Sequence, residues 1–319
     1  MRLALATLFL AASVTPAPAT PATPATPRAA SPATATDTST AAAPPIGVVA
    51  ARTMLPAADA CEDVACLLDR AYRRDAAARD LALALWTEHG DLAGVGPDEI
   101  MDGGYRGKIH LVPQLPVGGY RAHLAWVADG AHAIDRFFTD VFADHAAPRY
   151  RWRGLAFQFV RSVGKRTPSA YASGWTIAYN VEGSLLTSAG GVRETLFHEL
   201  FHSNDGDHGD WSAKHLRADY DAILARCRRA DAIRCLTPYA PNSTMVRGGT
   251  YYAFQQNNGD AVHEYAAELA VRYWKEQSEM LAAGKLARRA FKCGPAENAR
   301  AWQALVEEFF AGRDLVPAC

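Results

Sequence analysis

Apolar residues recur at helical spacing along much of the chain. In residues 64–88, 119–145 and 260–281 they fall three or four positions apart, which places them on one face of a helix. Further helices are predicted at 212–229 and 297–311. A helix with one apolar face packs that face against another element, so these stretches predict a mainly helical domain.

Three shorter stretches predict strands. Residues 175–181 read Trp-Thr-Ile-Ala-Tyr-Asn-Val and alternate with a period of two, and 108–112 and 153–163 are also strand candidates. The glycine-rich residues 94–107 predict a loop. A few strands among many helices predict a small sheet and an α+β, mainly helical fold class. The stretch 175–181 leads directly toward the next helix, as an interior strand or as an edge strand that binds an extended peptide along a cleft.

The N-terminal residues differ from the rest of the chain in composition. Residues 1–19 combine Arg2, a short apolar run and small residues at its end, which is typical of a secretory signal peptide. Residues 20–50 are mostly Ala, Pro, Thr and Ser and predict a disordered linker. The folded domain is then 51–319, with ordered structure expected from about Cys61. No later run is long and apolar enough to predict a membrane-spanning helix, so we expect a secreted or periplasmic protein.

All six cysteines lie outside the predicted signal, and an even number in an exported chain predicts disulfide bonds. A thiolate metal site is the alternative, but the chain contains no C-x-x-C motif. A straight helix holds residues five apart too far apart for a bridge, so Cys61 is expected to precede the helix that carries Cys66. We expect bonds between nearest neighbours: Cys61–Cys66, Cys227–Cys235 and Cys293–Cys319.

The charge balance argues against one class of partner. The net charge is −1. A protein that binds nucleic acid through a general basic field carries an excess of Lys and Arg, so we expect no nucleic-acid partner. The apolar content is ordinary for a globular protein with a packed core.

The residues that indicate chemistry concentrate in the stretch 193–210. Residues 198–202 read His-Glu-Leu-Phe-His, an H-E-x-x-H motif. On a helix, His198 and His202 lie one turn apart and about 40° apart around the axis, so both imidazoles point the same way. Two neutral imidazoles in this arrangement suit a zinc ion, which takes nitrogen ligands at about 2.0–2.1 Å. Glu199 is placed to accept a proton from a zinc-bound water, which makes it the candidate catalytic general base.

The neighbouring residues predict that this motif lies on a helix beside a cleft. The segments Thr187-Ser188 and Gly190-Gly191 supply a helix start, and Asn204 and Gly206 supply a stop. Chance occurrence of the motif on an ordinary surface helix is the alternative. Four apolar residues give the helix a flank to bury: Leu196, Phe197, Leu200 and Phe201.

A catalytic zinc ion usually has three protein ligands and one position open for water. Glu264 and Glu268 lie one turn apart on the helix predicted at 260–281 and share a face. One of these carboxylates can bind the metal while the other accepts a hydrogen bond from a ligand histidine. His263 adjoins Glu264 but points about 100° away from it on a helix, which disfavours it as a ligand.

The two segments resemble the gluzincin group of zinc metalloproteases, in which H-E-x-x-H is followed by a glutamate ligand on a later helix. Residues 264–268, Glu-Tyr-Ala-Ala-Glu, are similar to the second-ligand helix of the anthrax lethal-factor-like peptidases. The resemblance covers only the two helices. It implies that Glu264 binds zinc, that Glu268 supports the site from outside, and that a small sheet lies above the H-E-x-x-H helix of a zincin-like domain.

His208 is the rival third ligand. It stands ten residues after His198, where the metzincin pattern places its third histidine. That pattern requires glycine seven residues after the first histidine so that the chain can turn back, whereas this chain has Asp205 there, with the glycine one residue later. We therefore expect Glu264 rather than His208 to complete the site.

Other polar residues are expected to have ordinary roles. Asp205, Asp207 and Asp210 resemble half of a calcium loop, but the glutamate that completes an EF-hand is missing. His123 and His132 lie in the helix predicted at 119–145, where isolated histidines are expected at the surface or the core edge rather than as ligands.

The motif and the resemblance together predict a secreted metallopeptidase that uses one zinc ion to hydrolyse a peptide or protein. Glu199 deprotonates the water and then protonates the leaving amine. Tyr251 and Tyr252 are candidate donors to the oxyanion, with a slight preference for Tyr252, although core packing also explains both. Two other functions stay open: a zinc hydrolase of a non-peptide amide such as a cell-wall fragment, and a non-catalytic module pinned by zinc. The intact Glu199 argues against the second, because a structural pin needs no base.

Overall fold

The folded part of the chain begins within the predicted linker. In the computed structural model, helix α1 (Val48–Met54) buries Ala51 and Met54. Met54 packs so closely on Gly94 that a Cβ at residue 94 would lie 2.6 Å from the Met54 Cβ. The domain therefore starts before the predicted boundary at residue 51 and well before Cys61, because the alanine-rich composition hid a short packing face. The predicted signal lies outside the described residues, which are 46–55, 61–103, 106–228, 232–246, 249–255 and 261–319.

The long predicted helices are present, with shifted ends. They are α2 (Val64–Ala71), α3 (Ala76–His89), α4 (Arg121–Val141), α5 (Ala189–Asp207), α9 (Ala261–Ala283) and α10 (Ala296–Phe309). The stretch 64–88 forms two helices because the Asp75 carboxylate accepts a hydrogen bond from the Ala78 N–H and caps α3 separately. The stretch 212–229 is also divided. The shorter elements are α6 (Trp211–His215), α7 (Arg217–Arg226), α8 (Ala232–Leu236), η2 (Gly118–Tyr120), η3 (Thr237–Tyr239), η4 (Tyr252–Phe254) and η5 (Phe291–Cys293).

Within the described residues, a six-stranded mixed sheet accompanies the helices, which confirms the α+β, mainly helical fold class. Its strands are β1 (Leu92–Val95), β2 (Glu99–Asp102), β3 (Lys108–Pro113), β4 (Ala156–Ser162), β5 (Ala170–Ser173) and β6 (Thr176–Asn180). The order is β2-β3-β4-β6-β5, with β4 and β6 parallel. β1 pairs in parallel with the first part of β4, and β3 pairs antiparallel with its last part.

The predicted strands 108–112, 153–163 and 175–181 correspond to β3, β4 and β6. β1 and β5 were not predicted, and β2 lies where a loop was expected. Each of these has four residues, which is too short for a periodic pattern to identify, so pairing with neighbouring strands decides its conformation. The strand at 175–181 is interior, because β6 lies between β4 and β5, and β5 forms this edge of the sheet.

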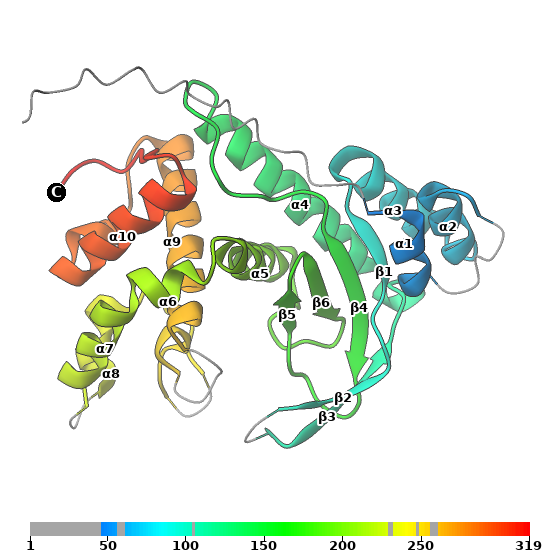
Figure 1. Cartoon of the computed structure of the whole chain (residues 1–319), viewed down its shortest axis with the longest axis horizontal. Coiled ribbons are helices and arrows are strands. Elements are labelled where there is room, and N and C mark those ends of the chain that lie inside the picture. Colours follow the sequence, from blue (N-terminus) through cyan, green and yellow to red (C-terminus); the bar gives the residue numbers. More distant parts are fainter. Residues whose placement is uncertain (1–45, 56–60, 104–105, 229–231, 247–248, 256–260) are drawn as a thin grey trace, which may run out of the picture. The chain divides into compact units, whose positions relative to one another are not determined.

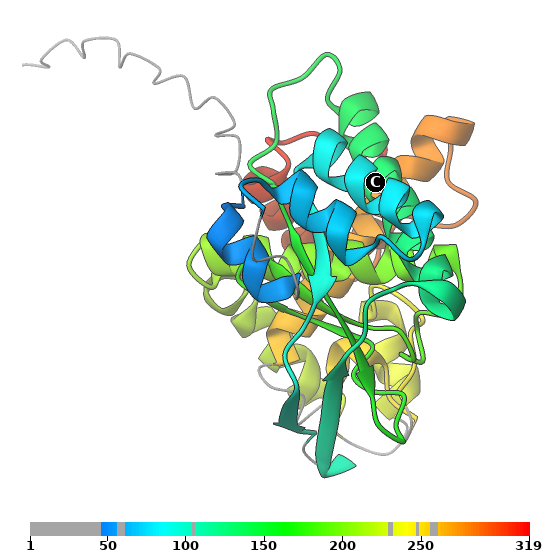
Figure 2. The same ribbon diagram turned by 90° about the vertical axis from the view of Figure 1, so that its right-hand side faces the viewer.

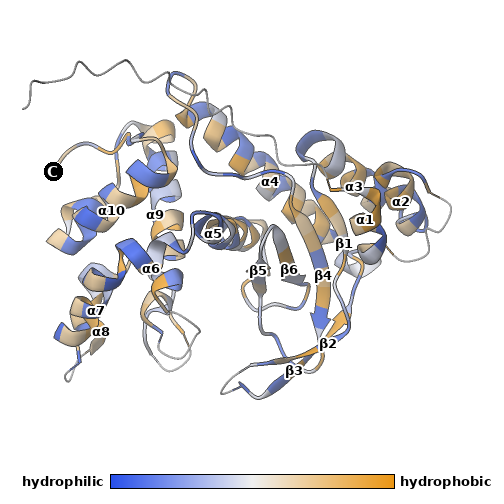
Figure 3. Cartoon of the chain, in the orientation of Figure 1, coloured by the Kyte–Doolittle hydropathy of each residue, from blue (hydrophilic) through white to orange (hydrophobic). Residues whose placement is uncertain are grey.

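Helix α5 runs through the middle of the folded domain. Figure 1 shows it end-on between the sheet and α9, with α4 alongside. In Figure 2, α1, α2 and α3 lie near β1, and the β2–β3 hairpin extends below them. The helices α4, α9 and α10 carry both hydrophobic and hydrophilic residues (Figure 3), as expected for helices with one buried face. In α5, by contrast, every residue from 195 to 201 is buried, so this helix is enclosed on all sides.

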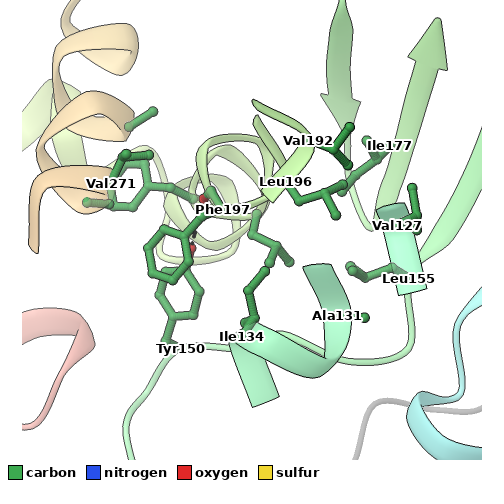
Figure 4. Close-up of a cluster of buried hydrophobic side chains, with 14 of the residues drawn as sticks. Val127, Ala131, Ile134, Tyr150, Leu155, Ile177, Val192, Leu196, Phe197 and Val271 are labelled. Carbon is green, nitrogen blue, oxygen red and sulfur yellow. Dashed lines mark hydrogen bonds between the residues drawn. The ribbon is translucent and has the colours of Figure 1, made fainter. Parts of the chain in front are cut away.

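Aromatic packing fixes how α5 is turned about its axis. Phe197 stacks on Tyr150 with ring centroids 5.6 Å apart, and on Trp274 of α9 at 5.4 Å. Figure 4 shows Leu196 on the adjacent side of α5, toward Ile177 of β6. Because residues on either side of the helix are held by the core, the polar residues between them can point in only one direction.

The three predicted disulfide bonds are present, with Cα atoms 5.4–5.5 Å apart. Cys61 precedes α2 and Cys66 lies on it, as the spacing required. Three disulfides fit a protein that folds in an oxidising compartment outside the cytoplasm. In the described part of the chain, no helix is both long enough and apolar enough to cross a membrane. The bonds are Cys61–Cys66, Cys227–Cys235 and Cys293–Cys319.

A buried carboxyl joins the start of β1 to the start of β4. Asp91 is fully buried, and its Oδ1 accepts a hydrogen bond of 2.8 Å from the Leu155 N–H, while Oδ2 has no partner among the described residues. Burial raises the pKa of Asp91 from its ordinary 3.8 to about 8, against the opposing effect of hydrogen bonds from the Leu155 and Gly154 N–H groups. At neutral pH this carboxyl is therefore protonated in the folded protein.

We expect the Asp91→Asn variant to gain stability relative to the wild type as the pH rises from about 4 to about 8. In that window the folded wild type holds a proton that the unfolded chain has lost, so its free energy of unfolding falls as the pH rises. Asparagine keeps an acceptor for Leu155 and removes this loss, which is on the order of several kcal/mol across the window. Denaturant unfolding at a series of pH values measures the difference, with Asp140→Asn, an exposed position on α4, as the control. Parallel curves for wild type and Asp91→Asn would refute the prediction.

Candidate metal centre

Local capping and the surrounding core set the position of the H-E-x-x-H residues. The Ser188 hydroxyl accepts a hydrogen bond of 3.2 Å from the Gly191 N–H and starts α5 at the predicted place. His198 and Glu199 are 8% and 7% exposed, so the motif lies deeper than a surface helix would place it. His202, one turn later, is partly exposed. The helix that carries the motif is therefore buried rather than an ordinary surface helix.

Helix α9 brings Glu264 to the two histidines. Glu264 Oε2 lies 3.0 Å from His198 Nε2 and 3.5 Å from His202 Nε2, and the two Nε2 atoms are 3.1 Å apart. Ligands held at about 2.0–2.1 Å in a tetrahedral arrangement lie about 3.3–3.4 Å from one another. The three atoms thus form a triangle of the size that one small metal ion requires. Two imidazole nitrogens and one carboxylate oxygen are a donor set that zinc accepts.

The charges around this triangle also fit a cation. Glu199, Glu264 and Glu268 place three carboxylates around two imidazoles in a buried region. A buried charge is costly unless an opposite charge or a metal ion compensates it. Either protonated histidine or a bound cation can supply that compensation.

The pKa shifts describe how imidazole protons compensate the carboxylate charges of the site when no metal ion is bound. Burial by itself would lower the pKa of His198, but the neighbouring carboxylates of Glu264 and Glu268 hold it well above its ordinary value. Burial would raise the pKa of Glu264, and hydrogen bonds from His198 and His202 instead hold it far below its usual range. A divalent ion at the same point would displace the imidazole protons and take over their role, so metal binding at this site releases protons.

Glu268 contacts the ring nitrogen of His198 that lies opposite the one facing Glu264. Its Oε1 lies 3.4 Å from His198 Nδ1, the ring nitrogen that faces away from Glu264, and its Oε2 accepts a hydrogen bond of 3.3 Å from the Thr244 hydroxyl. The Asn242 side chain in turn donates to the Glu268 carbonyl oxygen at 2.7 Å. A carboxylate on the second nitrogen of a ligand histidine fixes its tautomer and its orientation. This is the position that the resemblance implied for Glu268 as the supporting residue.

Glu199 lines a cavity that two corners of the triangle, His202 and Glu264, also border. The cavity has a volume of 360 Å³, and His202, Glu264 and residues 170–172 of β5 contribute to its lining together with Glu199. Burial raises the pKa of Glu199, while the nearby imidazoles and a hydrogen bond from the Ala172 backbone act in the opposite direction. A carboxyl of raised pKa beside a polar cavity is suited to accept and return a proton.

The rival ligand His208 does not join the group. Its Nδ1 lies 2.7 Å from Glu308 Oε1 on α10, and its Nε2 lies 3.1 Å from the Arg149 carbonyl oxygen. Both ring nitrogens therefore hold other segments to the end of α5: one contacts α10, and the other contacts the loop between α4 and β4. The Asp205 position explains the difference: its carboxylate accepts hydrogen bonds from the Ser212 N–H and hydroxyl, so α5 continues to Asp207 rather than turning back at residue 205.

Of the remaining candidate residues, Tyr252 and His263 line the cavity and Tyr251 does not. Tyr252 lines the cavity, and its ring centroid lies 5.7 Å from that of His198. The Tyr251 hydroxyl is instead 3.0 Å from the Thr237 hydroxyl. His263 also borders the cavity, with Nδ1 3.6 Å from Asp205 Oδ2.

The sequence did not reveal β5 or the two residues that hold Glu268 in place, Thr244 and Asn242. Residues 170–172 of β5, Ala-Tyr-Ala, carry no motif and no detectable period. Thr244 and Asn242 lie in an irregular segment between α8 and η4, where no spacing rule connects them with α9.

Comparisons with protein-family models, with curated proteins and with solved structures return no match. The argument for function therefore depends on the geometry of the site.

We expect His202→Ala and Glu264→Ala each to lower the zinc content of the purified protein by one equivalent per chain, because each removes one corner of the triangle. His208→Ala is the matched control, since it removes a histidine of the same segment that lies outside the group. Elemental analysis after gel filtration measures the content, and circular dichroism checks the fold. Zinc retained in Glu264→Ala, or lost in His208→Ala, would show that the third ligand is misassigned.

Proposed function

We propose that this protein is a zinc-dependent metallopeptidase, secreted or periplasmic, that hydrolyses a peptide or protein substrate. The observation that carries the proposal is that three donors, His198, His202 and Glu264, converge on one point, and that two of them, His202 and Glu264, border the same cavity as the buried carboxyl of Glu199. A site that only pins the fold with a metal has no need for a carboxyl directed into an adjoining cavity. Three disulfides support a location in an oxidising compartment.

The residues of the chain have separate tasks in this proposal. A zinc ion, when bound, polarises a carbonyl oxygen and lowers the pKa of a water molecule. Glu199 accepts the proton of the attacking water and returns it to the leaving amine. Glu268 keeps the His198 ring in position, and the Ala172 N–H keeps the Glu199 carboxyl oriented.

The edge strand favours a peptide over a non-peptide amide. β5 is the last strand of the described sheet, it pairs only with β6, and it borders the cavity. An extended peptide can add to such an edge by main-chain hydrogen bonds, which would place one of its carbonyls beside Glu199. Hydrolysis of a cell-wall amide remains the second candidate, because the same donors could act on it.

We expect Glu199→Gln to retain zinc and to lose hydrolysis by roughly a hundred- to ten-thousand-fold in kcat, because the amide keeps the shape of the side chain but cannot accept the proton. A peptide-library cleavage assay measures activity, and elemental analysis measures zinc. The same two preparations are incubated with cell-wall fragments. Cleavage of fragments but not of peptides would favour the second candidate, and equal activity of variant and wild type would exclude Glu199 as the base.

We expect Tyr252→Phe to lower kcat by about a hundredfold with little change in KM, if its hydroxyl donates to the oxyanion. Tyr251→Phe is the matched control, because it removes the neighbouring hydroxyl, which contacts Thr237. Steady-state kinetics on a peptide identified in the library measures both variants. Equal kinetics of the two would assign Tyr252 to packing alone.

A further inference from the structure

A second group of potential ligands lies where α3 meets α4. A ring nitrogen of His89, a ring nitrogen of His132 and a carboxylate oxygen of Glu88 lie within 4.8 Å of one another. Glu88 and His89 end α3, which Gly90 closes in the left-handed conformation with φ 71°. His132 comes from the middle of α4. None of the three was expected to be a ligand from the sequence, because His132 lies 44 positions after Glu88.

The contacts within the group leave one nitrogen without a partner. His132 Nε2 lies 2.6 Å from Glu88 Oε2, and the two imidazole rings are 4.9 Å apart between centroids, edge to face. His89 is 7% exposed, and its Nε2 is buried with no hydrogen-bond partner among the described residues. A buried polar nitrogen that has lost water and gained no partner is unfavourable for the folded state. A metal ion would be such a partner.

The surroundings keep His89 available as a neutral ligand. Burial is the main cause that lowers the pKa of His89, and the neutral imidazole is the form that binds a metal ion. Asp135 on α4 also faces the group, but its Oδ1 accepts hydrogen bonds from Trp152 and Arg153, so we do not count it as a ligand. The two carboxylates near this group, those of Glu88 and Asp135, carry more charge than the single guanidinium of Arg153.

We propose that Glu88, His89 and His132 form a binding site for a divalent transition-metal ion that fastens α3 to α4. Two imidazoles and one carboxylate suit zinc, copper or nickel rather than calcium or magnesium, which prefer oxygen ligands. Water fills the remaining positions, because Glu88 is exposed and His132 partly so. The site is independent of the proposed peptidase activity: its residues come from other helices, and none of them lines the cavity beside Glu199.

Zinc stoichiometry tests this site separately from the first. The full-length protein is stripped with a chelator, and zinc chloride is titrated by calorimetry into wild type, His132→Ala, His202→Ala and the double variant. We expect two, one, one and no equivalents per chain, respectively. His110→Ala is the matched control: His110 forms a comparable pair with Asp98, at 2.7 Å, but it belongs to no group of three potential ligands among the described residues, so this variant keeps the wild-type stoichiometry.

Two further measurements exclude an effect of misfolding. Glu88→Gln removes the exposed carboxylate and little else, so we expect it to weaken zinc binding at this site by about tenfold or more with the fold intact. In the His202→Ala background, zinc should raise Tm only while His132 is present, because a ligand that binds the folded state stabilises it. Equal zinc binding by His132→Ala and wild type, or a zinc-dependent rise in Tm that persists without His132, would overturn the proposal.

Discussion

The structure depends on how closely α5 and α9 approach each other while both carry charged side chains into the space between them. Glu264 and Glu268 of α9 reach opposite sides of one buried imidazole, His198, at 3.0 and 3.4 Å. Burying carboxylates in this way is unfavourable unless cations share the site. The aromatic packing of Phe197 against α9 and Tyr150 offsets that cost by holding the helices together, so the ionisable cluster persists inside a well-packed core.

The enclosure of α5 also bears on the proposed catalytic role of Glu199. A group that is buried on a rigid helix loses little orientation freedom when a substrate arrives. Glu199 is restrained by the backbone of β5 on one side and by the core beneath the helix, and yet it faces a cavity large enough for part of a substrate. The same burial that raises its pKa therefore prepares it to exchange a proton.

The arrangement of β5 connects the sheet with the site. An interior strand, β6, carries the alternating pattern, while the neighbouring edge strand provides the wall of the cavity. Edge strands with free hydrogen-bonding groups tend to associate with other extended chains. In this protein the edge strand lies beside the carboxyl of Glu199, and this position is the basis for proposing an extended peptide as the substrate.

The sequence by itself determined the elements whose cause is local. Helical spacing located α4, α5, α9 and α10, the H-E-x-x-H spacing placed His198 and His202 on one face, and short separations were sufficient to pair the cysteines correctly. These properties depend on residues within a few positions of one another, so a linear pattern records them. The resemblance, rather than a spacing rule, indicated Glu264.

Tertiary structure alone decided the rest. Whether Glu264 or His208 lies beside the histidines depends on where α9 and α10 pack, and packing joins residues more than sixty positions apart. The four-residue strand β5 forms because β6 is available as a partner. The group at Glu88, His89 and His132 likewise exists only because α3 folds back on α4. Contacts between distant segments have no counterpart in a local pattern, which is why no reading of the sequence alone could locate them.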